Sequence, residues 1–194
     1  MNNPPKAKKS KPAPTYRKRT LSRLAAIQIF YQFEFYEKKI SLEEIKNSLL
    51  DNYALEQEEE VSSYRKRIDL NLLETLLASI NLGVEEIDHE ISGLLKEGWD
   101  LDQLPDVMLC ILRLGSFELK FVQDVPLKVV IDEYVDIAAS FFENKKVTFL
   151  NATLESLAKH YRAEEFEKVR NRRWQKVLLE PVYDLFKPQI LAYF

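Results

Sequence analysis

The sequence predicts an all-α fold, because apolar residues recur at helical spacing in one segment after another. No stretch alternates apolar and polar residues for long enough to predict a β-strand, and the chain has only four glycines. Its 194 residues, 46% hydrophobic and 30% charged, are typical of a globular protein with one domain or two small subdomains. A chain of this length can bury a sizeable core.

Residues 1–16 form a basic arm, for which we predict disorder. The arm has four prolines among lysines, a composition that buries too little apolar surface to offset the entropy of ordering. Eight of the 28 basic residues lie within residues 1–23, which contain no acid. The rest of the chain therefore has 20 basic and 31 acidic residues. A basic arm on an acidic body is typical of a protein with a polyanionic partner, because phosphate binding depends on local charge. The alternative is a tail that only improves solubility.

The first helix is predicted from Thr20 to about Lys38, a segment without breakers that is apolar nearly all round from Leu24 onward. Such a helix must be central to the fold. It joins a basic, polyanion-binding end to an end that anchors in the core.

Two arginines at the start of this helix, Arg19 and Arg23, are one helical turn apart, and Phe30 lies further along the same stripe. Guanidinium groups beside an aromatic ring suit single-stranded RNA, because arginines hold phosphates and rings stack on bases. In the alternative interpretation, Phe30 is a core residue and the arginines only make the helix start polar.

Further helices follow in order. A Ser-Leu-Glu-Glu capping box at residues 41–44 predicts a helix from 42 to about 53. Residues 56–67 are charged and lack an apolar period, which predicts a loop or a solvated helix end. Apolar residues at helical spacing then continue from 70 to 94 past Gly83, which predicts one long kinked helix or two.

The second half begins at a joint near residues 98–101. Prolines then start two helices, one from about 105 to 121 and one from about 126 to 142. Apolar residues at 149–158 predict another helix, and residues 163–180 are predicted to form an extra one in a C-terminal extension, 163–194. The inner face of the 126–142 helix is expected to contain Val129, Val130, Tyr134, Ile137 and Phe141.

No catalytic, metal or cofactor site is predicted, so we expect a protein that is not an enzyme. Cys110 lies in an apolar helix, where a buried and inert thiol is expected. His89 and His160 lack the spacing of zinc ligands, and the glycines are too scattered for a phosphate-binding loop. Paired acids are expected to be solvated helix faces.

Composition also predicts a cytoplasmic protein with no membrane partner. No apolar run approaches the ~18 residues that a membrane-spanning helix needs, and the basic N-terminus lacks the apolar core of a secretory signal. A lone cysteine cannot form an internal disulfide, which fits a reducing compartment.

Five sequence blocks, in this order, resemble the NusB family of bacterial transcription antitermination factors. Each block alone is weak evidence, but five in order are specific, and together they cover about residues 19–161. The blocks are R-x-x-S-R-L-A-A-x-Q-x-F-Y (19–31), G-W-x-L-D-Q-L (98–104), I-L-R-L-G-S-F-E-L (111–119), D-V-P-L-K-V-V-I-D-E-Y-V-D-I-A (124–138) and F-L-N-A-T-L-E (149–155).

The resemblance implies a NusB-like helical RNA-binding domain over residues 17–162, made of two packed subdomains of about 17–97 and 98–162. It also implies a non-enzymatic role. The family pairs with NusE, a small-subunit ribosomal protein, on the boxA element of nascent transcripts, especially ribosomal RNA leaders. The complex then helps the RNA polymerase elongation complex to read through terminators.

Family motifs also imply the binding residues. Arg19, Arg23, Tyr31 and Phe149 match the family's RNA-binding surface, whereas Arg17 and Lys18 join it only because they belong to the same basic run. The helix that faces the ribosomal protein in the family supplies the expected partner residues, which are Met108, Leu109, Leu112 and Arg113.

Departures from the family pattern affect both surfaces. Met108, Leu109 and Cys110 stand where the family usually has an acid, a base and Ala, which predicts a more apolar or a weaker partner contact. Near the second RNA-facing loop, Phe142, Lys145, Thr148 and Ala152 replace the usual Gly, acid, Lys and Gly. We expect Lys145 to supply a phosphate contact that Thr148 no longer makes.

Two other functions are compatible with the sequence. One is a helical scaffold in ribosome assembly with only loose RNA affinity. The other is the RNA-targeting module of a ribosomal RNA methyltransferase, which ranks last because the chain lacks a glycine-rich cofactor loop and is too short for that catalytic domain.

Overall fold

A computed structural model describes residues 18–55, 68–95 and 100–169 of the chain. These residues form helices and no strand, which confirms the all-α prediction. None of the helices in these ranges is both long and apolar enough to cross a membrane. The helices are α1 (Lys18–Phe35), α2 (Leu42–Leu55), α4 (Leu70–Leu82), α5 (Val84–Ser92), the short 3-10 helix η1 (Leu101–Gln103), α6 (Asp106–Phe121), α7 (Leu127–Ala139) and α8 (Asn144–Tyr161).

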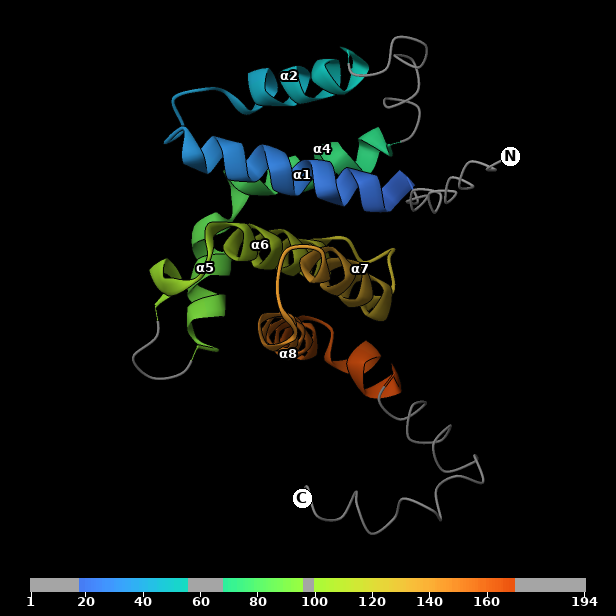
Figure 1. Cartoon of the computed structure of the whole chain (residues 1–194). Helices are drawn as coiled ribbons and strands as arrows, with labels where there is room; N and C mark the ends of the chain where they lie inside the picture. Colours follow the sequence, from blue (N-terminus) through green and yellow to red (C-terminus); the bar gives the residue numbers. More distant parts are fainter. Residues whose placement is uncertain (1–17, 56–67, 96–99, 170–194) are drawn as a thin grey trace, which may run out of the picture.

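Helix α1 lies at the centre of the arrangement, as predicted. It packs against α2 and α4 on one side and against α6 and α7 on the other, and α8 covers the far side of α6 and α7 (Figure 1). Ala25, Ala26 and Ile29 are fully buried because neighbours cover α1 on both sides. The division into subdomains of about 17–97 and 98–162 stays a prediction, and α1 contacts helices from both ranges.

The boundaries of the first helices follow from local chemistry. Helix α1 ends at Phe35, earlier than predicted, because Glu37 and Lys38 adopt the left-handed backbone region, with φ of 50° and 61°. The capping box before α2 is confirmed. The backbone N–H of Ser41 donates to Glu44 Oε2 at 3.1 Å, and the N–H of Glu44 donates to Ser41 Oγ at 3.2 Å.

The segment from residue 70 to residue 94 forms two helices instead of one kinked helix. The break falls at Gly83, which ends α4 and precedes α5. At the start of α4, Asp69 accepts a hydrogen bond from the N–H of Leu72 at 3.1 Å, a normal N-cap.

The α7–α8 connection differs from the prediction. Helix α7 ends at Ala139, and α8 begins at Asn144, so the turn between them lies inside the segment predicted to be helical. Of the expected inner face, Val129 and Phe141 are 45% and 50% exposed, so placing them inside was wrong. Phe141 follows the last helical residue, and the helical phase on which the prediction relied no longer applies there.

The first residues of the C-terminal extension are part of the folded body. Residues 163–169 are helical, which confirms the start of the predicted extra helix, and residues 170–180 lie outside the described ranges. Arg162 donates to the carbonyl oxygens of Gln123 and Val125, each at 2.8 Å, and pairs with Glu165 at 3.0 Å. Glu165 in turn accepts from the N–H of Leu127 at 2.9 Å. Arg162 and Glu165, the C-terminal clasp, therefore fix the turn between α6 and α7.

We predict that Arg162→Ala lowers the free energy of unfolding by about 1–3 kcal/mol, because it removes both hydrogen bonds to the turn and the partner of Glu165. Urea denaturation followed by circular dichroism measures the change. Lys159→Ala, at an exposed position in the last turn of α8, is the control and should have no effect. Equal midpoints for the two variants would show that the clasp does not stabilise the fold.

Candidate functional site

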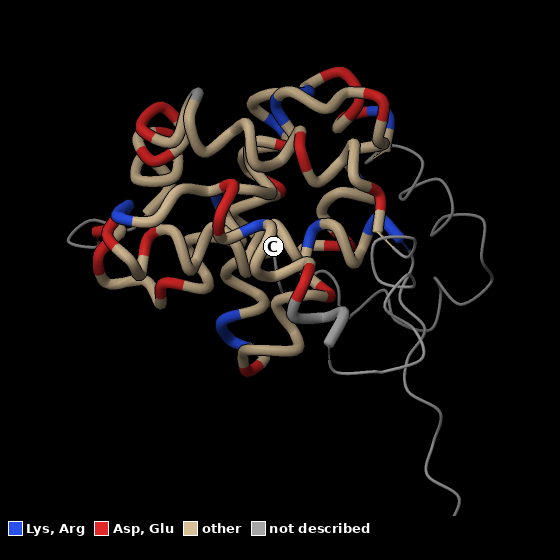
Figure 2. The backbone as a smooth tube through the Cα atoms, turned by 90° about the horizontal axis from the view of Figure 1, so that it is seen from above, with Lys and Arg blue, Asp and Glu red and all other residues tan. Residues whose placement is uncertain are grey.

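Charge is distributed unevenly over the described body. Acidic residues occur along most of the helices (Figure 2), and most lysines and arginines are paired with them. A few cations have no acidic partner among the described residues, which leaves them available to an anionic ligand. They are Lys18, Arg19, Lys145, Lys146 and Lys159.

The first turn of α1 contains two of these cations. Lys18 is exposed, and Arg19 is half-buried, with a buried Nε that has no hydrogen-bond partner among the described residues. The positive end of the helix dipole adds to their charge. Both residues are therefore suitable contacts for phosphate. Arg17, predicted to belong to the same site, lies outside the described residues.

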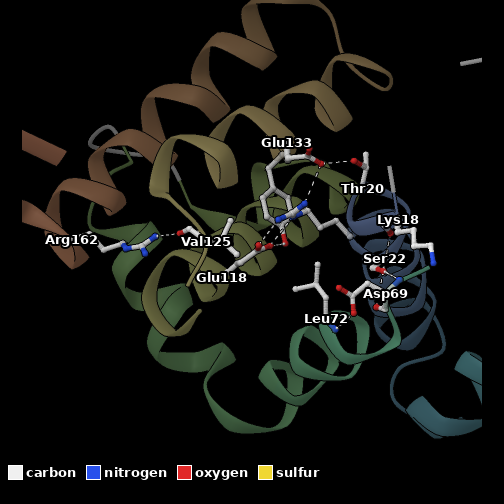
Figure 3. Close-up of polar contacts among 11 residues, drawn as sticks. Lys18, Thr20, Ser22, Asp69, Leu72, Glu118, Val125, Glu133 and Arg162 are labelled. Carbon is white, nitrogen blue, oxygen red and sulfur yellow. Dashed lines mark hydrogen bonds and ion pairs between the residues drawn. The ribbon is translucent and has the colours of Figure 1, made fainter. Parts of the chain in front are cut away.

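Arg23 is an internal residue instead, only 1% exposed. Its Nε and Nη2 donate to the two carboxylate oxygens of Glu118 in α6, at 2.9 and 2.6 Å, and its Nη1 donates to Glu133 in α7 at 3.2 Å (Figure 3). Tyr134 donates its hydroxyl hydrogen to Glu118 at 3.0 Å. The prediction that Arg23 contacts RNA was therefore wrong, because the guanidinium is enclosed and all its charge is used inside the fold.

The Arg23 guanidinium remains charged in this buried position. Burial by itself lowers the pKa of Arg23, but the hydrogen bonds and charge of Glu118 raise it above its usual value. Burial, followed by the negative charge of Glu118, raises the pKa of Tyr134 well above 10, so its hydroxyl keeps its proton and remains a donor. The three side chains therefore form a bonded unit that joins α1, α6 and α7.

The second group of cations lies in the first turn of α8. Lys145 is exposed, and Nζ of Lys146 lies 5.7 Å from the ring centroid of Phe142. The rings of Phe141 and Phe142 are 6.3 Å apart, and Phe149, one turn along α8, is half-buried against the core. The structure thus gathers Lys145 and Phe149, both predicted, with Phe141 and Lys146, which the sequence analysis missed.

The sequence did contain an indication of these missed residues. Two residues separate the adjacent phenylalanines from the adjacent lysines, and a turn between helices exposes side chains that a continuous helix would bury. The prediction of an unbroken helix to Phe142 concealed this arrangement.

A separate hollow of about 330 Å³ lies between the end of α1, η1 and the first half of α6. Tyr31 stacks on Phe35 at a centroid distance of 6.3 Å along one wall, and Phe35 is largely exposed. The residues around the hollow are Tyr31, Glu34, Phe35, Leu101, Asp102, Leu104, Asp106, Leu109, Cys110 and Arg113.

The hollow is negatively charged. Arg113 forms two hydrogen bonds of 2.7 Å with Asp88 and lies 3.7 Å from Glu34, so its charge is already neutralised. Asp102 and Asp106 form no hydrogen bond or ion pair through their carboxylates among the described residues. An acidic, aromatic wall favours a cationic ligand and disfavours phosphate.

The predicted partner residues divide into two groups. Leu109 and Arg113 line the hollow, whereas Met108 and Leu112 are 1% and 0% exposed and belong to the core. A direct partner contact for Met108 and Leu112 was therefore a wrong prediction, because helices pack on more than one side of α6. Tyr31 lines the same hollow as Leu109 and Arg113, and its contact with RNA stays a prediction.

The only cysteine also lies at this hollow and is buried, as predicted. Burial raises the pKa of the Cys110 thiol to about 12, although the nearby Arg113 charge opposes the increase. The thiol is therefore protonated near neutral pH, where a reactive cysteine would be a thiolate.

In its described part, the chain is thus an all-helical protein with cations that lack an acidic partner, some of them beside aromatic rings, and with a separate acidic hollow. The NusB family model matches residues 20–159. The chain therefore belongs to the NusB family of transcription antitermination proteins.

Individual relatives agree with this assignment. The transcription antitermination protein NusB of Novosphingobium aromaticivorans is 36% identical over 74% of this chain and 95% of its own length. The NusB protein of Rhodopseudomonas palustris is 30% identical over 78% and 84%. Among solved structures, T. maritima NusB aligns with a TM-score of 0.61 at 30% identity, over 78% of this chain and 99% of its own. A chain in the crystal structure of a plectonemic RNA supercoil aligns with a TM-score of 0.58 at 26% identity, over 77% and 99%.

We predict that Arg23→Met destabilises the protein by about 3–5 kcal/mol, because Glu118 would remain buried as an uncompensated charge. The double variant with Glu118→Gln should recover much of this loss, since the amide is neutral and still accepts from Tyr134. Chemical denaturation measures both changes. If Arg23→Met instead folds as stably as the wild type and only RNA affinity falls, Arg23 is a surface residue and the internal assignment is wrong.

Proposed function

We propose that this protein is a non-enzymatic RNA-binding transcription antitermination and elongation factor of the cytoplasm. It binds boxA-type single-stranded RNA together with NusE, the small-subunit ribosomal protein. As part of the RNA polymerase elongation complex, it promotes read-through of ribosomal RNA operons. Family membership supports this role, and the distribution of charge on the chain supports the assignment of its surfaces.

One observation supports the assignment of an RNA-binding surface. Among the described residues, five cations have no acidic partner, and four of these lie in the first turns of α1 and α8; exposed or half-buried aromatic rings accompany those of α8. Unpaired cations bind phosphate without first breaking an internal ion pair. Rings beside them stack on unpaired bases, which are available only in single strands.

The two cationic turns lie on either side of the second half of α7. Thr20 in the first turn of α1 is bonded to Glu133 of α7, and α7 ends six residues later at Ala139, before the turn into α8. At a rise of 1.5 Å per residue, this is about 9 Å along the helix axis. The two turns also lie on opposite sides of α7, so an RNA strand that contacts both must span the width of the packed helices in addition to this length.

We predict that Lys18→Ala with Arg19→Ala weakens binding to a boxA-like RNA strand and lowers the salt slope, by about 0.7 per lost phosphate contact. Lys145→Ala with Lys146→Ala should have a similar effect. Gel-shift titrations at several salt concentrations measure affinity and slope together. Lys159→Ala, which removes the fifth unpaired cation of the described part of the chain, is the control, and unchanged affinity and slope in both double variants would contradict the RNA surface.

The same assay with NusE tests the wider proposal. Discrimination between a boxA-like strand and a scrambled strand, present or enhanced when NusE is added, is the expected result. Weak binding without discrimination in either condition would favour the scaffold in ribosome assembly.

For the ribosomal protein we propose the acidic hollow. Proteins of the ribosome bind RNA through basic surfaces, which complement the carboxylates of Asp102 and Asp106, and a cationic side chain would also contact the rings of Tyr31 and Phe35. The apolar contact expected from Leu109 is retained on the wall of the same hollow.

We predict that Asp102→Lys with Asp106→Lys weakens association with NusE at least tenfold, because two attractive charges become repulsive. Binding of RNA to the isolated protein should not weaken. Isothermal titration at two salt concentrations measures the partner affinity. Asp124→Lys with Glu164→Lys reverses two exposed charges that do not line the hollow and is the matched control, and an equal loss in both double variants would show that only net charge matters.

A further inference from the structure

An acid lies beside the cationic first turn of α1. Thr20 Oγ1 donates to Glu133 Oε2 at 2.6 Å, and the same oxygen accepts from Nη1 of Arg23 at 3.2 Å (Figure 3). The Glu133 side chain is 20% exposed, so its negative charge contributes to the electrostatic potential at the surface. Lys18 and Arg19, in the same turn, form no ion pair with it.

The opposite side of this turn is also bonded. Ser22 Oγ accepts from the backbone N–H of Asp69 at 2.8 Å, next to the start of α4 (Figure 3). The first turn of a helix frays easily, because its first N–H groups have no partner within the helix. Thr20 and Ser22 therefore hold this turn against α7 and α4.

On electrostatic grounds alone, an acidic residue is not expected beside the first turn of α1. A negative charge near a phosphate-binding turn repels RNA, so the carboxylate of Glu133 carries a cost if the turn binds RNA. Arg23 offsets only part of that charge, because it is already shared with Glu118. An acid at this position needs a compensating role, and its bond to Thr20 supplies one.

We propose that Glu133 is a positioning residue for RNA. Fixed by Arg23, it holds Thr20 and so keeps Lys18 and Arg19 in the orientation in which they contact phosphates. Ordering of the turn before binding removes an entropic cost from association. This inference rests on the proposed RNA surface of α1.

The direction in which one substitution changes RNA affinity tests this proposal. If Glu133 only repels RNA, Glu133→Ala strengthens binding; if it positions the turn, Glu133→Ala weakens binding. Asp136→Ala is the matched control, because Asp136 is an exposed acid one turn further along α7 whose carboxylate makes no hydrogen bond among the described residues. Loss of Asp136 should leave binding unchanged or slightly tighter, and Glu133→Gln, which keeps an acceptor for Thr20, should retain near wild-type affinity.

Thr20→Val provides an independent test that leaves the Arg23 and Glu118 pair intact. We expect affinity for a boxA-like single-stranded RNA to fall about two- to tenfold, the factor equivalent to one hydrogen bond of ordinary strength. The salt slope should not change, because both cations remain. Thermal unfolding of each full-length variant identifies any general loss of structure.

Two results would overturn the proposal: wild-type RNA affinity in a folded Thr20→Val variant, or tighter binding by Glu133→Ala. The Lys18→Ala and Arg19→Ala double variant separates this failure from that of the RNA surface. If the double variant binds RNA normally, the assignment of the RNA-binding surface is wrong. If it binds weakly while Thr20→Val binds normally, only the positioning role is wrong.

Discussion

The buried bond between Arg23 and Glu118 fixes the rotation of the central helix. Removing two charges from water costs several kcal/mol per ion, so the pair is tolerated only because every carboxylate oxygen accepts a hydrogen bond. Glu118 Oε1 accepts from Arg23, and Oε2 accepts from both Arg23 and Tyr134. Rotation of α1 about its axis would break these bonds. The face that points into the hollow and the turn that meets α7 are therefore set by the same contact.

The fold could be predicted because its determinants are local. Helical spacing of apolar residues identified the helices, and the capping box before α2 was found from the residue types at positions 41–44 alone. Helix ends were predicted less well. Glu37 and Lys38 have no special propensity for the left-handed region, and their conformation follows from how the chain turns towards α2. The end of α7 at Ala139 likewise depends on where α8 packs.

The candidate site could be predicted only in part. Helical spacing shows which residues share one face of a helix, but it does not show which other elements bury that face. Arg19 and Arg23 share a stripe, yet Arg19 lies at the end of the bundle whereas Arg23 is enclosed by α6 and α7. Glu118 is 95 residues away in the sequence, so no local pattern could indicate the pair. The predicted partner contact of Met108 was wrong for the same reason, since helices pack on more than one side of α6.

Helix α1 has chemically opposite ends. Its first turn is cationic, and its last turns, with Tyr31 and Glu34, form part of an acidic wall. Thirteen residues separate Lys18 from Tyr31, which is about 20 Å along the axis. The Debye length at physiological salt is only about 8 Å, so exposed charges at the two ends are largely screened from each other. One rigid helix can therefore hold an anionic ligand at one end and a cationic ligand at the other at the same time.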